Sequence, residues 1–266
     1  MFVTLITDCK DDNALGRSTT RLSALFPNTH ITTMGVNSDL EAAGNLIDAL
    51  DASEGKKGVL LVNVAPRHKT GKKWPNGTPF GYFYCGAGAS AHYQKTLIAS
   101  IDGLTLSLVK KFGLVEEIKL IDIPEVVTKL AQDKTITKEL ADRIIHTQFR
   151  SFEFLPRVAK WLSDDLFIPH NAYPISQIPD CPQAIWWIDN FGNCKTTLIE
   201  QDINFKEGQN VQTKFGNFKC CLRLKDVPDD QAAIIIGSSG LENKRFLEIV
   251  IQGQSAAKIL NLTTKQ

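Results

Sequence analysis

The sequence has no apolar run of the roughly 18 residues that a membrane-spanning helix needs. Its apolar start, Met1 to Ile6, gives way to polar residues at Asp8 and is too short for a secretory signal peptide. We therefore expect a cytoplasmic protein that has no membrane partner.

Cysteine is sparse, and the six cysteines include no Cys-x-x-Cys pair of the kind that binds metals. Two of them, Cys220 and Cys221, are adjacent, which favours reduced thiols over a disulfide framework. We expect no metal.

An excess of one charge is also missing, because 30 basic and 29 acidic residues give a formal net charge of +1. No whole-molecule field therefore favours nucleic acid, and we expect no nucleic-acid partner. A chain of 266 residues with 43% hydrophobic residues is long enough for one large domain or two small ones.

A dinucleotide-binding fingerprint is absent as well. Residues 80–89 contain Gly86 and Gly88 but lack the third glycine and the helix that should follow it. We interpret them as a strand and a loop.

The N-terminal half alternates short apolar runs with helical patterns, which predicts an α/β domain over residues 1–166. Its sheet is expected to be mostly parallel, with helices on both faces. The predicted strands are 2–6, 30–35, 59–64, 96–100 and 117–121, and the predicted helices are 18–25, 39–50, 104–112, 137–145 and 152–162. Ligands bind at the carboxyl ends of parallel strands, which directs attention to Asp8, to residues 63–68 and to residues 102–103.

The composition then changes, and four prolines, from Pro169 to Pro182 inclusive, fall within fourteen residues. Residues 167–182 are therefore predicted to be a linker. Short strands between Gly and Asn turns follow over residues 183–266, which predicts a small antiparallel β domain.

Within that second domain, the strand Ile185 to Ile188 runs into the turn Asp189-Asn190-Phe191-Gly192-Asn193. Carboxylate and amide side chains on a turn at a strand end are well placed to hold a ligand. An ordinary hairpin turn also fits this pattern.

Several stretches together resemble the S-adenosylmethionine hydroxide adenosyltransferase family, whose relatives include the fluorinase and the chlorinase. The stretches are 3–8, 38–43, 101–104, 187–193, 237–240, 246–249 and 255–257. Their order and spacing match the family across nearly the whole chain. The resemblance implies an α/β N-terminal domain, a β-barrel-like C-terminal domain and a homotrimer. It also implies that S-adenosylmethionine (SAM) lies between the N-terminal domain of one subunit and the C-terminal domain of its neighbour.

The resemblance further implies substrate-binding roles. Asp8 would bind the ribose hydroxyls and Asp189 the methionine ammonium, because a carboxylate accepts hydrogen bonds from both groups. Capping of the following turn is an equally good explanation of Asp8.

For the adenine, the resemblance implies Asn193 and the backbone near Ser238 and Ser239, with Phe191 packing nearby. Ser238 and Ser239 also fit an ordinary turn between two strands. Four extra residues, Leu241 to Lys244, follow them, and the sequence does not say how they affect the adenine pocket.

The chain departs from the family at the positions that activate water in the relatives. Relatives that use water carry an Asp, an Arg seven residues later, and a His in a Thr-Phe-His-Gly-Arg-Asp stretch, and this chain has Ala65, Lys72 and Phe149 there. Alanine and phenylalanine cannot deprotonate water. His68 is then the best candidate for a replacement base, and Arg150 occupies the small-residue position that holds the halide in the halogenases.

His68 belongs to a cationic loop that also contains Arg67, Lys69, Lys72 and Lys73. Such a loop suits a phosphate or another anion, although a solvated surface loop has the same composition.

Three hypotheses remain. The first is an enzyme that cleaves SAM by attack of water or an anion at the ribose 5′ carbon, with His68 and Arg150 as the candidate catalytic residues. With water it would form adenosine and methionine, as the SAM hydrolases do. The second is a catalytically inactive or regulatory trimer that binds adenosine or SAM. The third is a structural or partner-binding trimer whose pocket is closed.

Overall fold

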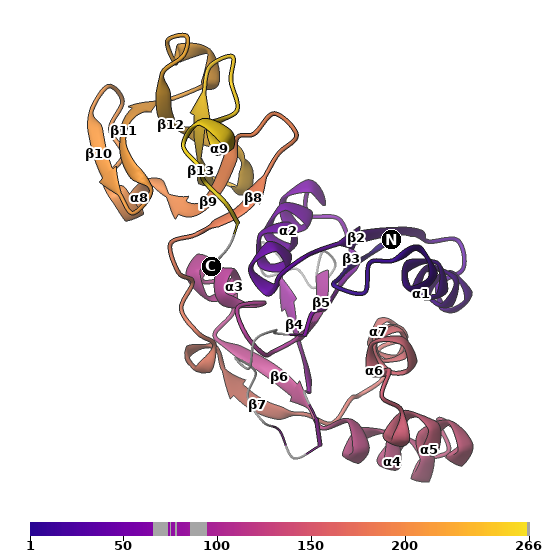
Figure 1. Ribbon diagram of the computed structural model, residues 1–266. Coiled ribbons are helices and arrows are strands. Elements are labelled where there is room, and N and C mark those ends of the chain that lie inside the picture. The colour runs from indigo at the N-terminus through magenta and orange to yellow at the C-terminus, as the bar shows by residue number, and fades with distance from the viewer. Residues whose placement is uncertain (66–73, 75, 78, 86–94, 265–266) are drawn as a thin grey trace. The chain divides into compact units, whose positions relative to one another are not determined.

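The computed structural model describes residues 1–65, 74, 76–77, 79–85 and 95–264 (Figure 1). The chain divides into two compact units. The first unit comprises residues 1–49 and 53–180, and the second comprises residues 50–52 and 181–266. Among the described residues, no helix is both long and apolar enough to cross a membrane.

A seven-stranded sheet forms the centre of the first unit, in the order β2-β1-β3-β5-β4-β6-β7. Its strands are β1 (Phe2–Thr7), β2 (His30–Gly35), β3 (Gly58–Asn63), β4 (Phe80–Cys85), β5 (Lys95–Ser100), β6 (Glu117–Ile121) and β7 (Asn171–Pro174).

The sheet is mixed, so the prediction of a mostly parallel sheet holds for one half of it. The pairings β1–β2, β1–β3 and β3–β5 are parallel, whereas β5–β4, β4–β6 and β6–β7 are antiparallel. A strand buried on both faces shows a continuous apolar run whichever way it points, so its composition does not reveal its direction. The edge strand β7 lies within the proline-rich stretch that the sequence predicts as a linker.

The helices of the first unit are α1 (Asp12–Leu25), α2 (Asp39–Ala52), α3 (Ser107–Phe112), α4 (Ile123–Gln132), α5 (Lys138–His146), α6 (Arg150–Glu153) and α7 (Leu155–Ser163). Side-chain caps begin α1, α4 and α5, as well as α2, whose cap is described below. Asp11, Asp122 and Thr137 accept from backbone amides of α1, α4 and α5 at 3.0, 3.2 and 3.2 Å, which satisfies donors that have no partner inside the helix.

The helix predicted over 152–162 is interrupted between α6 and α7. Pro156 lies in the first turn of α7, where the missing amide of proline costs nothing, so a new helix begins there. The resulting break separates Arg150 and Glu153 of α6 from the longer α7.

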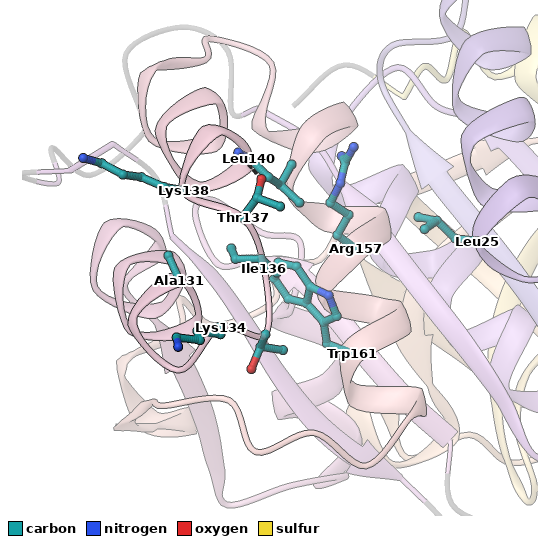
Figure 2. Close-up of a pocket in the computed structure, with 10 residues that line it drawn as sticks. Leu25, Ala131, Lys134, Ile136, Thr137, Lys138, Leu140, Arg157 and Trp161 are labelled. Carbon is teal, nitrogen blue, oxygen red and sulfur yellow. Dashed lines mark hydrogen bonds between the residues drawn. The ribbon is translucent and has the colours of Figure 1, made fainter.

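The main core of the first unit lies between one face of the sheet and the helices α1, α4, α5 and α7. Val3 and Leu5 of β1 point into it because alternate residues of a strand share a face, and Leu22 and Val158 meet them from α1 and α7. In Figure 1, α2 lies on the opposite face of the sheet. At the margin of this core, Leu25, Ile136 and Trp161 pack against the cluster and stay partly exposed (Figure 2).

The second unit contains a six-stranded sheet in the order β10-β11-β12-β13-β9-β8. Its elements are β8 (Ile185–Ile188), β9 (Cys194–Ile199), α8 (Glu200–Ile203), β10 (Asn210–Thr213), β11 (Gly216–Cys221), β12 (Ala232–Leu241), β13 (Lys244–Ile251) and α9 (Ala256–Ile259). Because β11 and β12 are parallel, the prediction of a purely antiparallel sheet is wrong for that pair. The pairings of the described residues include none between β8 and β10, which would close the sheet into a barrel.

The four extra residues lie at the tip of the hairpin formed by β12 and β13. Leu241 pairs with Lys244 across the hairpin, and Glu242 adopts the left-handed conformation with φ +53° that such tight turns require. These residues therefore form the hairpin turn without interrupting either strand.

Candidate functional site

A cavity of about 460 Å³ opens at the carboxyl ends of β1, β3 and β5, where ligands bind in sheets of this kind. Its volume falls within the range of small-molecule sites. Asp8, Cys9, Asn63, Val64, Ala65, Gly77, Phe80, Ser100, Thr147, Gln148, Phe149, Arg150 and Ser151 line it.

Hydrogen bonds between neighbouring strand ends fix the sheet side of this cavity. The Asp8 amide donates to the Asn63 carbonyl at 3.2 Å, and the Ala65 amide donates to Asp8 Oδ2 at 3.3 Å. Asn63 Nδ2 donates to Thr7 Oγ1 at 3.3 Å. Asp8 is half-buried and its carboxylate lines the cavity, so the carboxylate is placed to accept from a ligand in addition to capping the loop at Ala65.

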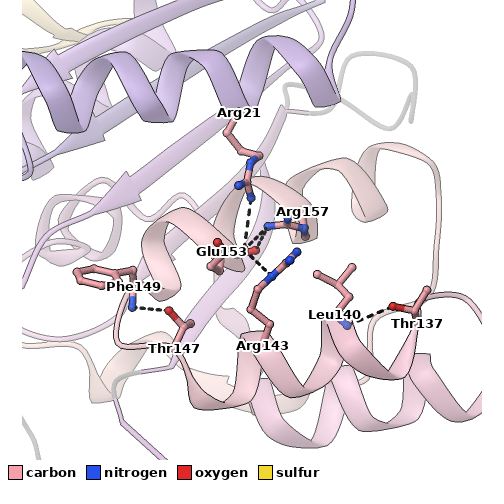
Figure 3. Close-up of polar contacts among 8 residues, drawn as sticks. All are labelled: Arg21, Thr137, Leu140, Arg143, Thr147, Phe149, Glu153 and Arg157. Atoms are coloured by element: carbon pink, nitrogen blue, oxygen red, sulfur yellow. Dashed lines mark hydrogen bonds and ion pairs between the residues drawn. The ribbon is translucent and has the colours of Figure 1, made fainter.

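The opposite wall is the segment that leads into α6. Thr147 Oγ1 accepts from the Phe149 amide at 2.9 Å (Figure 3), and the Phe149 side chain is 66% exposed. The Arg150 guanidinium donates to the carbonyl of Asn76. Arg150 is thereby held at the cavity, where it offers positive charge and N–H donors but no proton acceptor.

Three arginines surround the Glu153 carboxylate and connect α6 to neighbouring helices (Figure 3). Glu153 Oε2 lies 3.0 Å from Arg157 Nη1, 3.4 Å from Arg21 Nη1 and 3.5 Å from Arg143 Nε. We call these four residues the arginine cluster. The four residues come from α1, α5, α6 and α7. The cluster therefore connects the cavity wall that contains Phe149 and Arg150 to the other helices of the first unit.

Two further loops near strand ends are held by carboxylates. Ser38 Oγ accepts from the Glu41 amide at 3.1 Å and so caps α2, and Asp39 Oδ2 accepts from the Leu104 amide at 2.8 Å. Asp102 Oδ1 accepts from Trp74 Nε1 at 2.9 Å.

In the second unit, the Asp189 turn is closed by its own side chains. Asp189 Oδ1 accepts from the amides of Phe191 and Asn193, both at 2.9 Å, and Asn193 Nδ2 donates to Asp189 Oδ2 at 2.9 Å. Gly192 has φ +88°, and a Cβ added there would lie 2.9 Å from the Ser255 Cα, so the turn requires glycine. Phe191 lies at the tip of this turn and is 72% exposed.

Ser238 and Ser239 lie in β12 where its register with β13 shifts, between Ile236 and Gly240. Such a bulge releases backbone groups from the ladder. Ser238 is exposed, whereas Ser239 is 5% exposed and accepts from the ammonium of Lys195.

Beside Ser239 lies an ion pair that was not predicted from the sequence, between the partly buried Lys195 and the buried Glu248. Lys195 Nζ lies 3.9 Å from Glu248 Oε1 and 5.8 Å from the centre of the Trp186 ring. A glutamate in the apolar run of β13 was the available signal, since a charge in a buried strand needs a partner.

The structure thus brings Asp8 and Arg150 to one cavity, together with Ala65 and Phe149. His68 lies outside the described residues. The remaining predicted site residues, Asp189, Phe191, Asn193, Ser238 and Ser239, all lie in the second unit. In the part of the chain that the structure describes, no group of three or more His, Cys, Asp or Glu residues could hold a metal ion.

The comparison with protein families identifies the second unit. Residues 183–266 match the model of the SAM hydroxide adenosyltransferase C-terminal domain. The chain carries a SAM hydroxide adenosyltransferase C-terminal domain. This match confirms the resemblance to the family over residues 183–266.

Two crystal structures share the fold of this chain. An uncharacterized conserved protein from Thermotoga maritima has 15% sequence identity and a TM-score of 0.68, with 98% of this chain and 97% of that chain covered. A conserved hypothetical protein from Thermus thermophilus has 18% identity and a TM-score of 0.64, with 98% and 96% covered. At these identities the likeness shows the fold alone. No curated protein matches significantly.

Proposed function

We propose that the chain binds SAM and cleaves it by nucleophilic substitution at the ribose 5′ carbon. The observation that carries this proposal is the match of residues 183–266 to the C-terminal domain of a family named for transferring the adenosyl group of SAM to hydroxide. The cavity beside Asp8 supports it, because it combines a carboxylate that suits vicinal ribose hydroxyls with a volume that suits a small molecule.

In this proposal the substrate is held by residues of both units, taken from neighbouring copies in a cytoplasmic homotrimer. Asp8 accepts from the ribose hydroxyls and Asp189 from the methionine ammonium. Asn193 and the bulged backbone at Ser238 and Ser239 bind the adenine, and Phe191 covers it. The preformed Asp189 turn supports this role, because a turn whose side chains are already ordered loses little entropy on binding.

The proposed reaction converts SAM and water into adenosine and methionine. A bond forms between the water oxygen and the 5′ carbon while the bond from that carbon to the sulfonium sulfur breaks, and its electron pair leaves with the sulfur of methionine. His68 takes the proton that water loses. Arg150 holds the attacking group, whether polar or anionic, in line with the 5′ carbon. Such orientation alone can lower the barrier to substitution by roughly 7–11 kcal/mol.

A catalytically inactive or regulatory SAM-binding trimer is the second candidate. The observation that favours it is that Ala65 and Phe149 line the cavity at the positions where water-using relatives carry Asp and His. Neither side chain orients or deprotonates water, so a bound substrate would be held without being attacked.

Incubation of the protein with SAM, followed by chromatography of the products, distinguishes the two candidates. The proposal predicts adenosine and methionine in equal amounts, and loss of both with His68→Ala. Binding of SAM by calorimetry would establish the second candidate if no adenosine is released and no 5′-substituted adenosine forms when halide or other anions are present. Absence of both binding and products would refute both.

A further inference from the structure

A second cavity lies on the helical side of the first unit, and none of its lining residues lines the candidate site. This groove has a volume of about 660 Å³ and lies between the connection from α4 to α5, the end of α1 and the exposed side of α7. Figure 2 shows its lining: Leu25, Ala131, Lys134, Thr135, Ile136, Thr137, Lys138, Leu140, Arg157 and Trp161.

The floor of the groove is apolar and incompletely covered. Trp161 lies at its centre, with Ile136 beside it and Leu25 on the α1 side (Figure 2). All three pack against the main core but remain partly exposed. A planar apolar group lying on the indole would remove that surface from water, and this favours binding of an aromatic ring.

The walls of the groove carry positive charge only. Lys134, Lys138 and Arg157 line it, and none of the lining residues that the structure describes is acidic. Lys134 and Lys138 are exposed and form the rim of the groove, and the Lys138 side chain points away from Trp161 in Figure 2. Arg157 is held in place by its ion pair with Glu153.

Arg157 connects the groove to the arginine cluster. Three guanidinium groups there share the single carboxylate of Glu153, which leaves a formal excess of positive charge on this end of the groove. The pKa of Arg157 is lowered from its ordinary value by burial first and by repulsion from Arg21 second. A bound anion would offset that repulsion.

We propose that this groove binds a small aromatic anion, with the ring on Trp161 and a phosphate or carboxylate group toward Arg157 and the lysine rim. The apolar floor selects the ring and the unbalanced guanidinium charge selects the anion. A purely apolar ligand would leave that charge unmatched, and inorganic phosphate would leave the floor exposed.

Phenyl phosphate is the probe that combines both features, with benzoate, phenol and inorganic phosphate as the comparison ligands. Calorimetry measures affinity, and the indole N–H resonance of Trp161, assigned with Trp161→Phe, reports where the ligand sits. We expect phenyl phosphate to shift that resonance and to bind more tightly than phenol or inorganic phosphate. Benzoate tests whether a carboxylate serves as well as a phosphate, and binding by either acid supports the site.

The double variant Lys134→Gln/Lys138→Gln removes the rim without touching the core, since both lysines are exposed. We expect it to weaken phenyl phosphate binding about tenfold at low salt, because two charges near the anion are lost. The matched control is Lys129→Gln/Lys206→Gln, which removes the same charge from exposed positions outside the groove and should leave the affinity unchanged.

Three results would overturn the proposal. They are no shift of the Trp161 resonance at about 10 mM phenyl phosphate, an affinity for phenol or inorganic phosphate equal to that for phenyl phosphate, and equal losses in the rim variant and its control. None of these results depends on SAM, so the outcome is independent of the proposed function.

Discussion

Replacement of Glu153 by glutamine tests how the wall of the candidate site is held. The substitution keeps the shape of the side chain but removes the carboxylate that the three guanidinium groups of the arginine cluster share. Removing one partner of a fully buried ion pair costs about 3–5 kcal/mol.

The arginine cluster is not fully buried, and this lowers the expected cost. The side chains of Glu153 and Arg157 are 15% and 13% exposed, that of Arg21 is 23% exposed and that of Arg143 is 58% exposed. The Arg143 contact therefore contributes little, since water screens it. We expect Glu153→Gln to reduce the free energy of unfolding of the first unit by about 2–3 kcal/mol.

A urea titration followed at the Trp161 indole resonance measures this loss, because Trp161 belongs to the first unit. The matched control is Asp164→Asn, which removes one negative charge from an exposed ion pair with Lys160 at the end of α7 and should cost less than about 0.5 kcal/mol. Arg143→Gln should be nearly neutral, because it also removes like-charge repulsion. A Glu153→Gln loss no larger than that of the control would refute the role given to the arginine cluster.

Three further predictions concern the proposed ligand. Asp8→Asn should weaken SAM binding about tenfold in calorimetry, because a neutral amide accepts hydrogen bonds from hydroxyls more weakly than a carboxylate does. The melting temperature should stay unchanged, since the amide oxygen still accepts from the Ala65 amide. Unchanged affinity would show that Asp8 is not part of the site. Ala65→Asp combined with Phe149→His should raise the release of adenosine from SAM above the wild-type rate, and a rate no higher than wild type would show that the cavity does not hold the 5′ carbon there. Gly192→Ala should destabilise the second unit by about 1–3 kcal/mol and weaken SAM binding, since Cβ would meet Ser255 and φ is positive; full stability would contradict the turn geometry.

The sequence predicts individual elements well where the pattern is local. The strand predicted over residues 117–121 has the same bounds as β6. The helix predicted at Thr137 begins there because the Thr137 hydroxyl caps it. In contrast, α4 was not predicted, although Asp122 and Pro124 are a usual helix start.

Features that depend on distant partners were not predictable. The directions of β4 and β6 depend on which strands they join, and burial on both faces hides that choice. The arginine cluster joins Arg21 to Glu153, which are 132 residues apart, so no local pattern connects them. The position of Asp8 next to Asn63 follows from the sequence prediction, because parallel neighbours end at the same edge of the sheet.

The crystal structure of the protein with SAM tests the central claim most directly. The account predicts ribose hydroxyls within hydrogen-bond distance of Asp8 and the 5′ carbon in the cavity lined by Ala65, Phe149 and Arg150. It also predicts the methionine ammonium on Asp189 of a neighbouring copy. A structure grown at saturating SAM in which that cavity holds only water or protein side chains would contradict it.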